Sequence, residues 1–359
     1  MIAESLRQAL ADVPRVRLGH LPTPLEPGPR LPGGAKVLIK RDDLTALGMG
    51  GNKVRKLEFL CGDALSRGAD TLVTLGAAQS NHARLTAAAG AVLGIPTHLV
   101  LGGNAPDQLT GNQLLSALFG ATLHFPGTDD WDRLEEHTAD LSDQLTSEGR
   151  HVYRMPIGGS TGVGVLGFAA GWLELLDQCA DLSIEPSTII HASSTGGTHA
   201  GLLVGRAACR ERDAPLPDVL AIGVAKRPDD LAAASATLAA EALRRLGLGV
   251  EVHPEEILVD GRWQGEGYAV PTAEADAAVQ WAASRAALVL DRVYTGKAFA
   301  GLLGASDEGR WVGDDTVVFW HTGGQPAVFA PSGTPQPIRV PSDDQRISGV
   351  TVRPAGRMR

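Results

Sequence analysis

The chain has 359 residues, of which 43% are hydrophobic and 44 are glycine, which fits about two globular α/β domains with many tight strand-to-helix turns. A formal net charge of -9, with no basic run on any predicted element, argues against a nucleic-acid-binding protein and favours a small-molecule partner. The sequence has no run of about 18 apolar residues and predicts no secretory leader, so we expect a cytoplasmic protein without a membrane segment.

The three cysteines are Cys61, Cys179 and Cys209, which lie far apart on helical patterns. Their number is odd and none is part of a CxxC pair, so neither a disulfide framework nor a zinc site is indicated. We expect buried thiols and no metal.

The first fifty residues predict a lead-in to the first sheet. Residues 1–20 suggest an amphipathic helix that ends near Pro14, and the prolines at 22 and 24 keep the next segment extended. Thereafter helices are predicted at 55–67, 81–93, 107–118, 131–147, 162–178, 198–211, 230–246 and 272–286. Strands are predicted at Thr71–Leu75, His98–Leu101, Thr122–Phe125, His151–Arg154, Thr188–Ala192, Val219–Ala225 and Thr316–His321.

Strands that alternate with helices of this length predict parallel βαβ units. We expect a small domain at 53–157 and a large domain made of 158–330 together with 1–52. Two open, twisted, mainly parallel sheets would then face each other, with a ligand in the cleft at the carboxyl ends of their strands. Residues 331–359, rich in Pro, Gly, Ser and Arg, predict a loosely ordered tail.

A lysine follows a glycine-rich turn at 48–51. Asn52-Lys53 stands at the start of a helical pattern, beside glycines that let a planar ligand approach the backbone. Partial burial would lower the pKa of this lysine, and such a lysine can form a Schiff base. The alternative is an ordinary loop with a solvated lysine.

Polar residues stand at the start of the helix predicted at 81–93. Ser80, Asn81 and the free N–H groups of that helix can hold a carboxylate or a phenolate oxygen. The alternative is a simple helix cap. His82 is expected as a partly exposed polar residue rather than a catalytic base.

The segment Ser194-Thr195-Gly196-Gly197-Thr198 links a strand to a helix. Glycines at a helix N-terminus expose N–H groups to an anion, and the hydroxyls add donors. The segment lacks the GK[ST] of a Walker loop and the GxGxxG of a dinucleotide fold, so a monophosphate suits it better than a pyrophosphate. The alternative is a plain turn.

Three further polar groups stand in glycine-bearing segments. Thr322 follows the strand at 316–321 and can hydrogen-bond a heterocyclic nitrogen, while Tyr268 and Tyr294 each lie in a loop with glycine. Ordinary packing is the alternative for both tyrosines.

A Schiff-base lysine, a monophosphate loop, a partner for a ring nitrogen and a carboxylate site are together what pyridoxal 5'-phosphate requires. The chain resembles the D-cysteine desulfhydrase and 1-aminocyclopropane-1-carboxylate deaminase family of fold type II, the tryptophan-synthase-β-like fold. The resemblance covers roughly residues 16–330. Its motifs are KRDDLTALGMGGNKVRKLEFL, GADTLVTLGAAQSNHARLTAAAGAVLGI, SSTGGTHAGL, VYTGKAFAGL and FWHTGGQPAVFA.

The resemblance implies roles for these residues. The catalytic set is Lys53, Ser80, Tyr268 and Tyr294. The cofactor set is Lys53, Asn52, Lys56, Asn81, Ser194, Thr195, Gly196, Gly197, Thr198 and Thr322. The substrate set is Ser80, Asn81, His82, Tyr268 and Tyr294.

The resemblance also implies a homodimeric lyase that carries out α,β-elimination on a small amino acid, with D-cysteine preferred and pyruvate, ammonia and hydrogen sulfide as products. The deaminases carry a glutamate where this chain has Thr295 and a glutamine where it has His82. In having threonine and histidine at these positions, the chain is similar to the desulfhydrases. L-cysteate sulfo-lyases share Ser-Asn-His but usually do not continue HTGG with Gln-Pro, so they rank second. Val54, where the family usually has threonine, and the tail after Ala330 are further departures. A cyclopropane deaminase, a β-replacement synthase and a non-catalytic cofactor-binding protein are the remaining alternatives.

Overall fold

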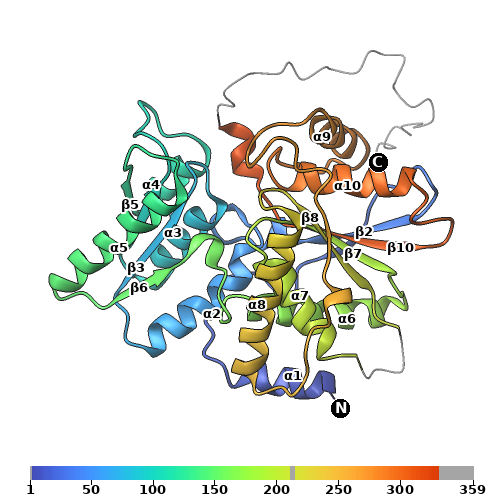
Figure 1. Ribbon diagram of the computed structural model, residues 1–359, viewed down its shortest axis with the longest axis horizontal. Helices are drawn as coiled ribbons and strands as arrows, with labels where there is room; N and C mark the ends of the chain where they lie inside the picture. The colour runs from blue at the N-terminus through green and yellow to red at the C-terminus, as the bar shows by residue number, and fades with distance from the viewer. Residues whose placement is uncertain (1, 211–214, 331–359) are drawn as a thin grey trace, which may run out of the picture.

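The structure is a computed structural model that describes residues 2–210 and 215–330, so the tail predicted at 331–359 lies outside the described residues. Its strands form two sheets, which lie side by side in Figure 1. The six-stranded sheet has the order β1-β2-β10-β7-β8-β9, and the four-stranded sheet has the order β5-β4-β3-β6. All neighbouring strands are parallel except β1 and β2. The predicted class, two mainly parallel α/β sheets, is confirmed.

The six-stranded sheet consists of β1 Leu25–Pro27, β2 Lys36–Arg41, β7 Thr188–Ser193, β8 Asp218–Gly223, β9 Leu258–Asp260 and β10 Thr316–His321. The four-stranded sheet consists of β3 Thr71–Gly76, β4 Thr97–Leu101, β5 Thr122–His124 and β6 Val152–Met155. The α-helices are α1 Ile2–Ala11, α2 Lys53–Ser66, α3 Asn81–Leu93, α4 Gly111–Leu118, α5 Trp131–Ser147, α6 Leu166–Leu182, α7 Gly197–Ala207, α8 Pro228–Leu246, α9 Ala273–Ala286 and α10 Thr295–Asp307.

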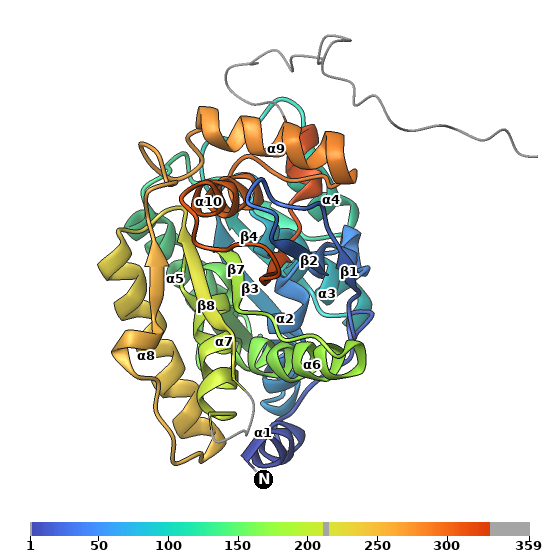
Figure 2. The same cartoon turned by 90° about the vertical axis from the view of Figure 1, so that its right-hand side faces the viewer.

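Helices cover both faces of each sheet. Figures 1 and 2 show α9 and α10 on one face of the six-stranded sheet and α6 and α7 on the other. Apolar side chains of α3 pack on one face of the four-stranded sheet and those of α5 on the other. We call these two layered assemblies the six-stranded unit and the four-stranded unit. The domain boundaries at 52/53 and 157/158 stay a prediction.

Helix α2 is attached to both units. Near its start, the buried Arg55 donates hydrogen bonds of 2.8 Å to Asp42, which follows β2, and to Glu174 on α6. A Cβ on Gly167 of α6 would collide with the backbone carbonyl of Arg55, so the two helices approach each other at the backbone. Near the other end of α2, Asp63 accepts a 2.8 Å hydrogen bond from Tyr153 on β6. The first turn of α2 is therefore held by the six-stranded unit, and Asp63 near its end is bound to β6 and also, at 2.9 Å, to Arg245 on α8 of the six-stranded unit.

Predicted and observed elements differ at specific points. Helix α6 begins at Leu166 rather than at 162. Strands β1, β2 and β9 and helix α10 were not predicted. Three glycines lower the helix propensity of α10, and packing overrides this, since a Cβ on Gly304 would enter the ring of Trp263.

The remaining composition-based expectations concern cysteines and membranes. All three cysteines are buried, and none forms a disulfide within the described residues, as predicted. Among residues 2–210 and 215–330, no helix has both the length and the apolarity needed to cross a bilayer.

Candidate active site

A cavity of about 840 Å³ lies where the two units meet. It is lined by segments that follow the carboxyl ends of β3, β7, β8 and β10, and by the start of α2. Parallel α/β sheets bind ligands at this end of their strands. The predicted site residues that line it are Asn52, Lys53, Ser80, Asn81, His82, Ser194, Thr195, Gly196, Gly197, Thr198, Tyr268, Tyr294 and Thr322. Lys56 does not line the cavity.

Lys53 is the first residue of α2. The peptide N–H of the preceding Asn52 donates a 3.0 Å hydrogen bond to the carbonyl of Thr322, which joins the lysine segment to the segment after β10. Burial lowers the pKa of Lys53 to about 8. Its Nζ atom has no hydrogen-bond partner among the described residues. An appreciable fraction of this amine is therefore neutral and nucleophilic near pH 7.

The loop at 194–198 has the geometry of an anion site. Gly196, at φ +86°, immediately precedes α7, so the first N–H groups of that helix stay unbonded by the helix itself. Thr198 accepts a 3.2 Å hydrogen bond from the Asn52 side chain, and Thr195 shares a 2.7 Å hydrogen bond with Ser160. A Cβ on Gly197 would lie 2.5 Å from the Ser160 hydroxyl, so only glycine allows this close packing.

Lys56 lies behind this loop, on the next turn of α2. Its Nζ donates to the Gly158 carbonyl at 3.1 Å and to the Ser160 hydroxyl at 3.0 Å. Burial, and then the charge of Lys53, hold the pKa of Lys56 well below its ordinary value.

The polar groups around this loop fit a phosphate. Neither Lys53 nor Lys56 pairs with a carboxylate in the described part of the chain, and the buried hydroxyl of Ser193 has no partner there. Two amines and a helix N-terminus without a counter-ion suit a bound dianion. The residues present therefore fit pyridoxal 5'-phosphate.

The start of α3 forms the opposite side of the cavity. Ser80 caps the helix, because its Oγ accepts a 3.1 Å hydrogen bond from the N–H of Ala83. The cap interpretation is thus observed, and the hydroxyl hydrogen remains available to a ligand. The side-chain carbonyl of Asn81 accepts a 3.0 Å hydrogen bond from Asn112, which orients the amide.

The expectation that His82 is partly exposed was wrong. Its ring is 2% exposed, and Nε2 lies 3.1 Å from the hydroxyl of Thr74 on β3. The loop at Gly159 covers it, since a Cβ there would lie 2.9 Å from the imidazole. Burial, together with the nearby charges of Lys53 and Lys56, keeps the pKa of His82 well below its ordinary value. The imidazole is therefore neutral, and its Nδ1 atom is buried without a partner in the described residues.

The two predicted tyrosines meet each other. The hydroxyls of Tyr268 and Tyr294 lie 2.5 Å apart. Burial raises the pKa of both phenols, most strongly that of Tyr294. Both groups therefore hold their protons at neutral pH and act as hydrogen-bond donors.

Asp291 fixes the segment that carries Tyr294. One carboxylate oxygen accepts from the N–H groups of Val293 and Tyr294 at 2.8 and 2.6 Å. The other accepts from the N–H and the hydroxyl of Thr295 at 3.1 and 2.7 Å. Thr295 was expected beside the cofactor ring, but it does not line the cavity, whereas Asp291 does. The Asp291 carboxylate thus accepts four hydrogen bonds from its own segment, three from N–H groups and one from a hydroxyl, and these bonds stabilise its negative charge.

The cavity wall also contains residues that sequence reasoning did not single out, among them Ser160, Asp291, Lys226 and Trp131. The GGST segment at 158–161 resembles the loop at 194–198 and was a usable signal for Ser160. Asp291 accepts hydrogen bonds from the N–H groups two and three residues later, at Val293 and Tyr294, which is the local spacing typical of an aspartate turn. A single lysine or tryptophan in a loop or at a helix start gives no such signal.

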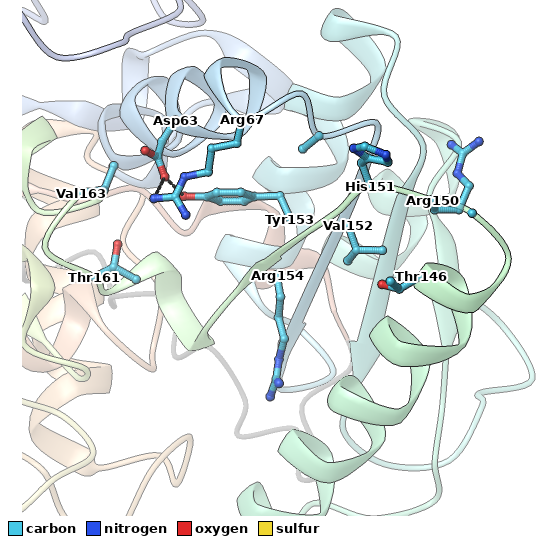
Figure 3. A pocket seen from close by; sticks show the side chains of 12 residues that line it. Asp63, Arg67, Thr146, Arg150, His151, Val152, Tyr153, Arg154, Thr161 and Val163 are labelled. Carbon is cyan, nitrogen blue, oxygen red and sulfur yellow. Dashed lines mark hydrogen bonds and ion pairs between the residues drawn. The ribbon is translucent and has the colours of Figure 1, made fainter.

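A second cavity, of about 750 Å³, lies between the end of α2 and β6 (Figure 3). None of the predicted site residues lines it. Figure 3 shows Arg67 directed at Asp63 and Tyr153, while Arg150 and Arg154 point elsewhere. These arginines are paired with Asp63, Asp70 and Glu135, respectively. The cations are satisfied and divergent, so this cavity does not compete as the active site.

Comparisons with known proteins agree with the geometry. A D-cysteine desulfhydrase of Klebsiella pneumoniae subsp. pneumoniae is 40% identical over 332 residues, which covers 90% of this chain and 98% of the relative. A crystal structure of an ACC deaminase homologue superposes with a TM-score of 0.81 at 36% identity, covering 90% of this chain and 96% of that one. The processed form of threonine deaminase isoform 2 from Solanum lycopersicum shares the fold, with a TM-score of 0.63 at 17% identity, covering 90% of this chain and 89% of that one.

These relatives confirm the resemblance stated from the motifs. The family model described as pyridoxal-phosphate dependent enzyme matches residues 16–323. The chain therefore belongs to the pyridoxal-phosphate dependent enzymes.

Proposed function

We propose that the protein catalyses α,β-elimination on a small amino acid, with D-cysteine as the preferred substrate and pyruvate, ammonia and hydrogen sulfide as products. The observation that carries the proposal is the unpartnered amine of Lys53, with its pKa lowered to about 8, in one cavity with the loop at 194–198 and the Tyr268–Tyr294 hydroxyl pair. The D-cysteine desulfhydrase that covers almost the same length supports the choice of substrate.

One side of the cavity would hold the cofactor and the other the substrate. The loop at 194–198, backed by Lys56 and Ser160, would bind the phosphate, Lys53 would bind the cofactor covalently, and Thr322 would face the ring nitrogen. Bound pyridoxal phosphate withdraws electrons from the amino acid, which acidifies its Cα–H and allows a β-substituent to leave. A hydroxyl partner such as Thr322 carries no negative charge that would hold the ring nitrogen protonated.

The substrate side is formed by α3 and the two tyrosines. The N-terminus of α3, with Ser80 and Asn81, would bind the substrate carboxylate. The amine of Lys53 would remove the Cα proton, and its lowered pKa keeps enough of it neutral for this role. The Tyr268–Tyr294 pair has one hydroxyl hydrogen beyond the bond between the two oxygens, and it can donate a hydrogen bond to the sulfur that leaves as hydrosulfide. The enamine released by elimination then reacts with water to give pyruvate and ammonia.

A substrate panel tests the proposal. The purified holoenzyme is given D-cysteine, L-cysteine, β-chloroalanine, cysteate and 1-aminocyclopropane-1-carboxylate, and pyruvate, 2-oxobutyrate, sulfide and sulfite are measured. Pyruvate and sulfide from D-cysteine, in equal amounts, are expected. Sulfite from cysteate as the main product would favour a sulfo-lyase, and no turnover by a protein that has bound its cofactor would overturn the elimination.

We further propose a cytoplasmic homodimer that contacts neither nucleic acid nor membrane, and a division into domains at 52/53 and 157/158. The family resemblance supports the dimer, the net charge of -9 argues against a nucleic-acid partner, and the alternation of strands and helices in the sequence supports the domain division. Sedimentation of the holoenzyme at two concentrations tests the dimer, with a monomer as the contradicting result.

A further inference from the structure

Trp131 is the tryptophan that lines the active-site cavity from the four-stranded unit. It is the first residue of α5 and is 40% exposed. The start of this helix is fixed, because Asp130 accepts a 3.0 Å hydrogen bond from the N–H of Arg133. An exposed indole that lines a cavity is available to contact a ligand.

The indole contacts the tyrosine pair across the cavity. Its ring lies edge-on to the ring of Tyr268, with centroids 6.1 Å apart at 70°. The rings of Tyr268 and Tyr294 lie 6.0 Å apart, and their hydroxyls are hydrogen-bonded. The three rings therefore form a row from the four-stranded unit to the start of α10. Within residues 2–210 and 215–330, no other Phe, Tyr or Trp lines this cavity.

The inner part of this row is immobilised. Tyr294 is held by its backbone N–H bond to Asp291, and Tyr268 is held by Tyr294. Trp131 is the outer member and has the largest side chain of the three. A long substrate side chain would pass the tyrosine pair and extend towards the four-stranded unit. There it would contact the indole of Trp131, which packs against Tyr268.

We infer that Trp131 determines specificity by limiting the length of the substrate side chain, an inference that rests on the proposed function. Cysteine, with a single sulfur on Cβ, fits in front of the indole, whereas an S-benzyl or another bulky β-substituent overlaps with it. Excluding a group by steric overlap with a cavity wall discriminates by tenfold or more, which corresponds to about 1.4 kcal/mol per tenfold.

The first experiment compares elimination by three holoenzyme variants. W131A removes the wall, W131F keeps a shorter aromatic ring, and R133A is the control, because Arg133 is exposed on the same helical turn and does not line the cavity. Pyruvate release gives kcat/KM for S-benzylcysteine and for cysteine. We expect W131A to raise the ratio of these two values by about tenfold or more, W131F to raise it less, and R133A to leave it within about threefold of wild type. An unchanged ratio in W131A overturns the inference.

The second experiment does not depend on elimination. Alanine and phenylalanine have no β-leaving group, and their dissociation constants follow from the change in cofactor absorbance of the holoenzyme. The wild type should bind alanine at least about tenfold more tightly than phenylalanine, and W131A or W131L should abolish this preference. A wild type that binds both equally contradicts the role of Trp131. If the wild type releases no pyruvate from any amino acid but shows the expected binding preference, the proposed function fails and the inference on Trp131 stands.

Discussion

Lys53 should attach to pyridoxal phosphate with a pH dependence set by its burial. With the pKa lowered from 10.5 to about 8, about 9% of the amine is neutral at pH 7. A solvated lysine at 10.5 would be about 0.03% neutral, so the rate of covalent attachment at pH 7 should be about 300-fold faster than for an exposed lysine. Between pH 6 and 10 the rate constant should rise and level off with a midpoint near 8.

The same shift has a consequence for stability. Because the folded-state pKa lies below the unfolded value, the charged lysine destabilises the cofactor-free protein fully below about pH 8, and the effect vanishes as the pH rises to 10.5. The difference corresponds to at most about 3 kcal/mol, and residual contact with solvent reduces it to about 1–3 kcal/mol. Lys53→Met should therefore stabilise the cofactor-free protein at pH 7 and not at pH 10.5.

The assay mixes cofactor-free protein with pyridoxal phosphate at a series of pH values and follows the visible band of the bound cofactor. Borohydride reduction and peptide mapping should find the label on Lys53. The control is Lys36→Met, since the Lys36 side chain is 48% exposed and lies outside the cavity, and it should leave the midpoint unchanged. A midpoint above about 9.5, or a label on another lysine, would refute the reasoning.

Three further outcomes are expected. Gly197→Ala should weaken cofactor binding by at least about tenfold in a titration, because its Cβ would displace the Ser160 hydroxyl 2.5 Å away; unchanged affinity would contradict the phosphate loop. Asp291→Asn turns one acceptor oxygen into a donor facing Thr295 and should lower the free energy of unfolding in urea by about 2–4 kcal/mol, with a loss under 1 kcal/mol as the contrary result. Turnover of 1-aminocyclopropane-1-carboxylate should be at least about a hundredfold below that of D-cysteine, because ring opening needs a further acid–base group; dominant 2-oxobutyrate would reverse the weight given to Thr295 and His82.

Hydrophobic periodicity predicted the helices and strands whose limits are set by residues close to one another in the sequence. Helices α3 and α5 and strand β10 begin and end where their periodicity indicates, and Lys53 stands at a helix start as its glycine turn predicts. Helix α10 was missed because its glycines are explained by neighbours distant in sequence, such as Trp263.

The arrangement of the cavity depends still more on distant contacts. The burial of His82 is set by the loop at Gly159, and the contact of Trp131 with Tyr268 joins residues from two units. Neither periodicity nor spacing in the sequence predicts such contacts. The motifs that follow the strands nevertheless identified thirteen residues that line the cavity. The roles of the individual residues remain predictions.

Arg55 holds the first turn of α2 to the six-stranded unit. Cofactor binding and the passage of small molecules therefore depend on different parts of the cavity wall. Lys53 stands at the proposed boundary 52/53, but the first turn of α2 is bound to Asp42 and Glu174, so Lys53 is held to the same six-stranded unit as the loop at 194–198. The start of α3 and the indole of Trp131 belong to the other unit. A rotation of one unit against the other would widen the passage to solvent without stretching the span between the covalent attachment point and the phosphate loop. Such a rotation would let small molecules be exchanged at every turnover while the prosthetic group stays bound.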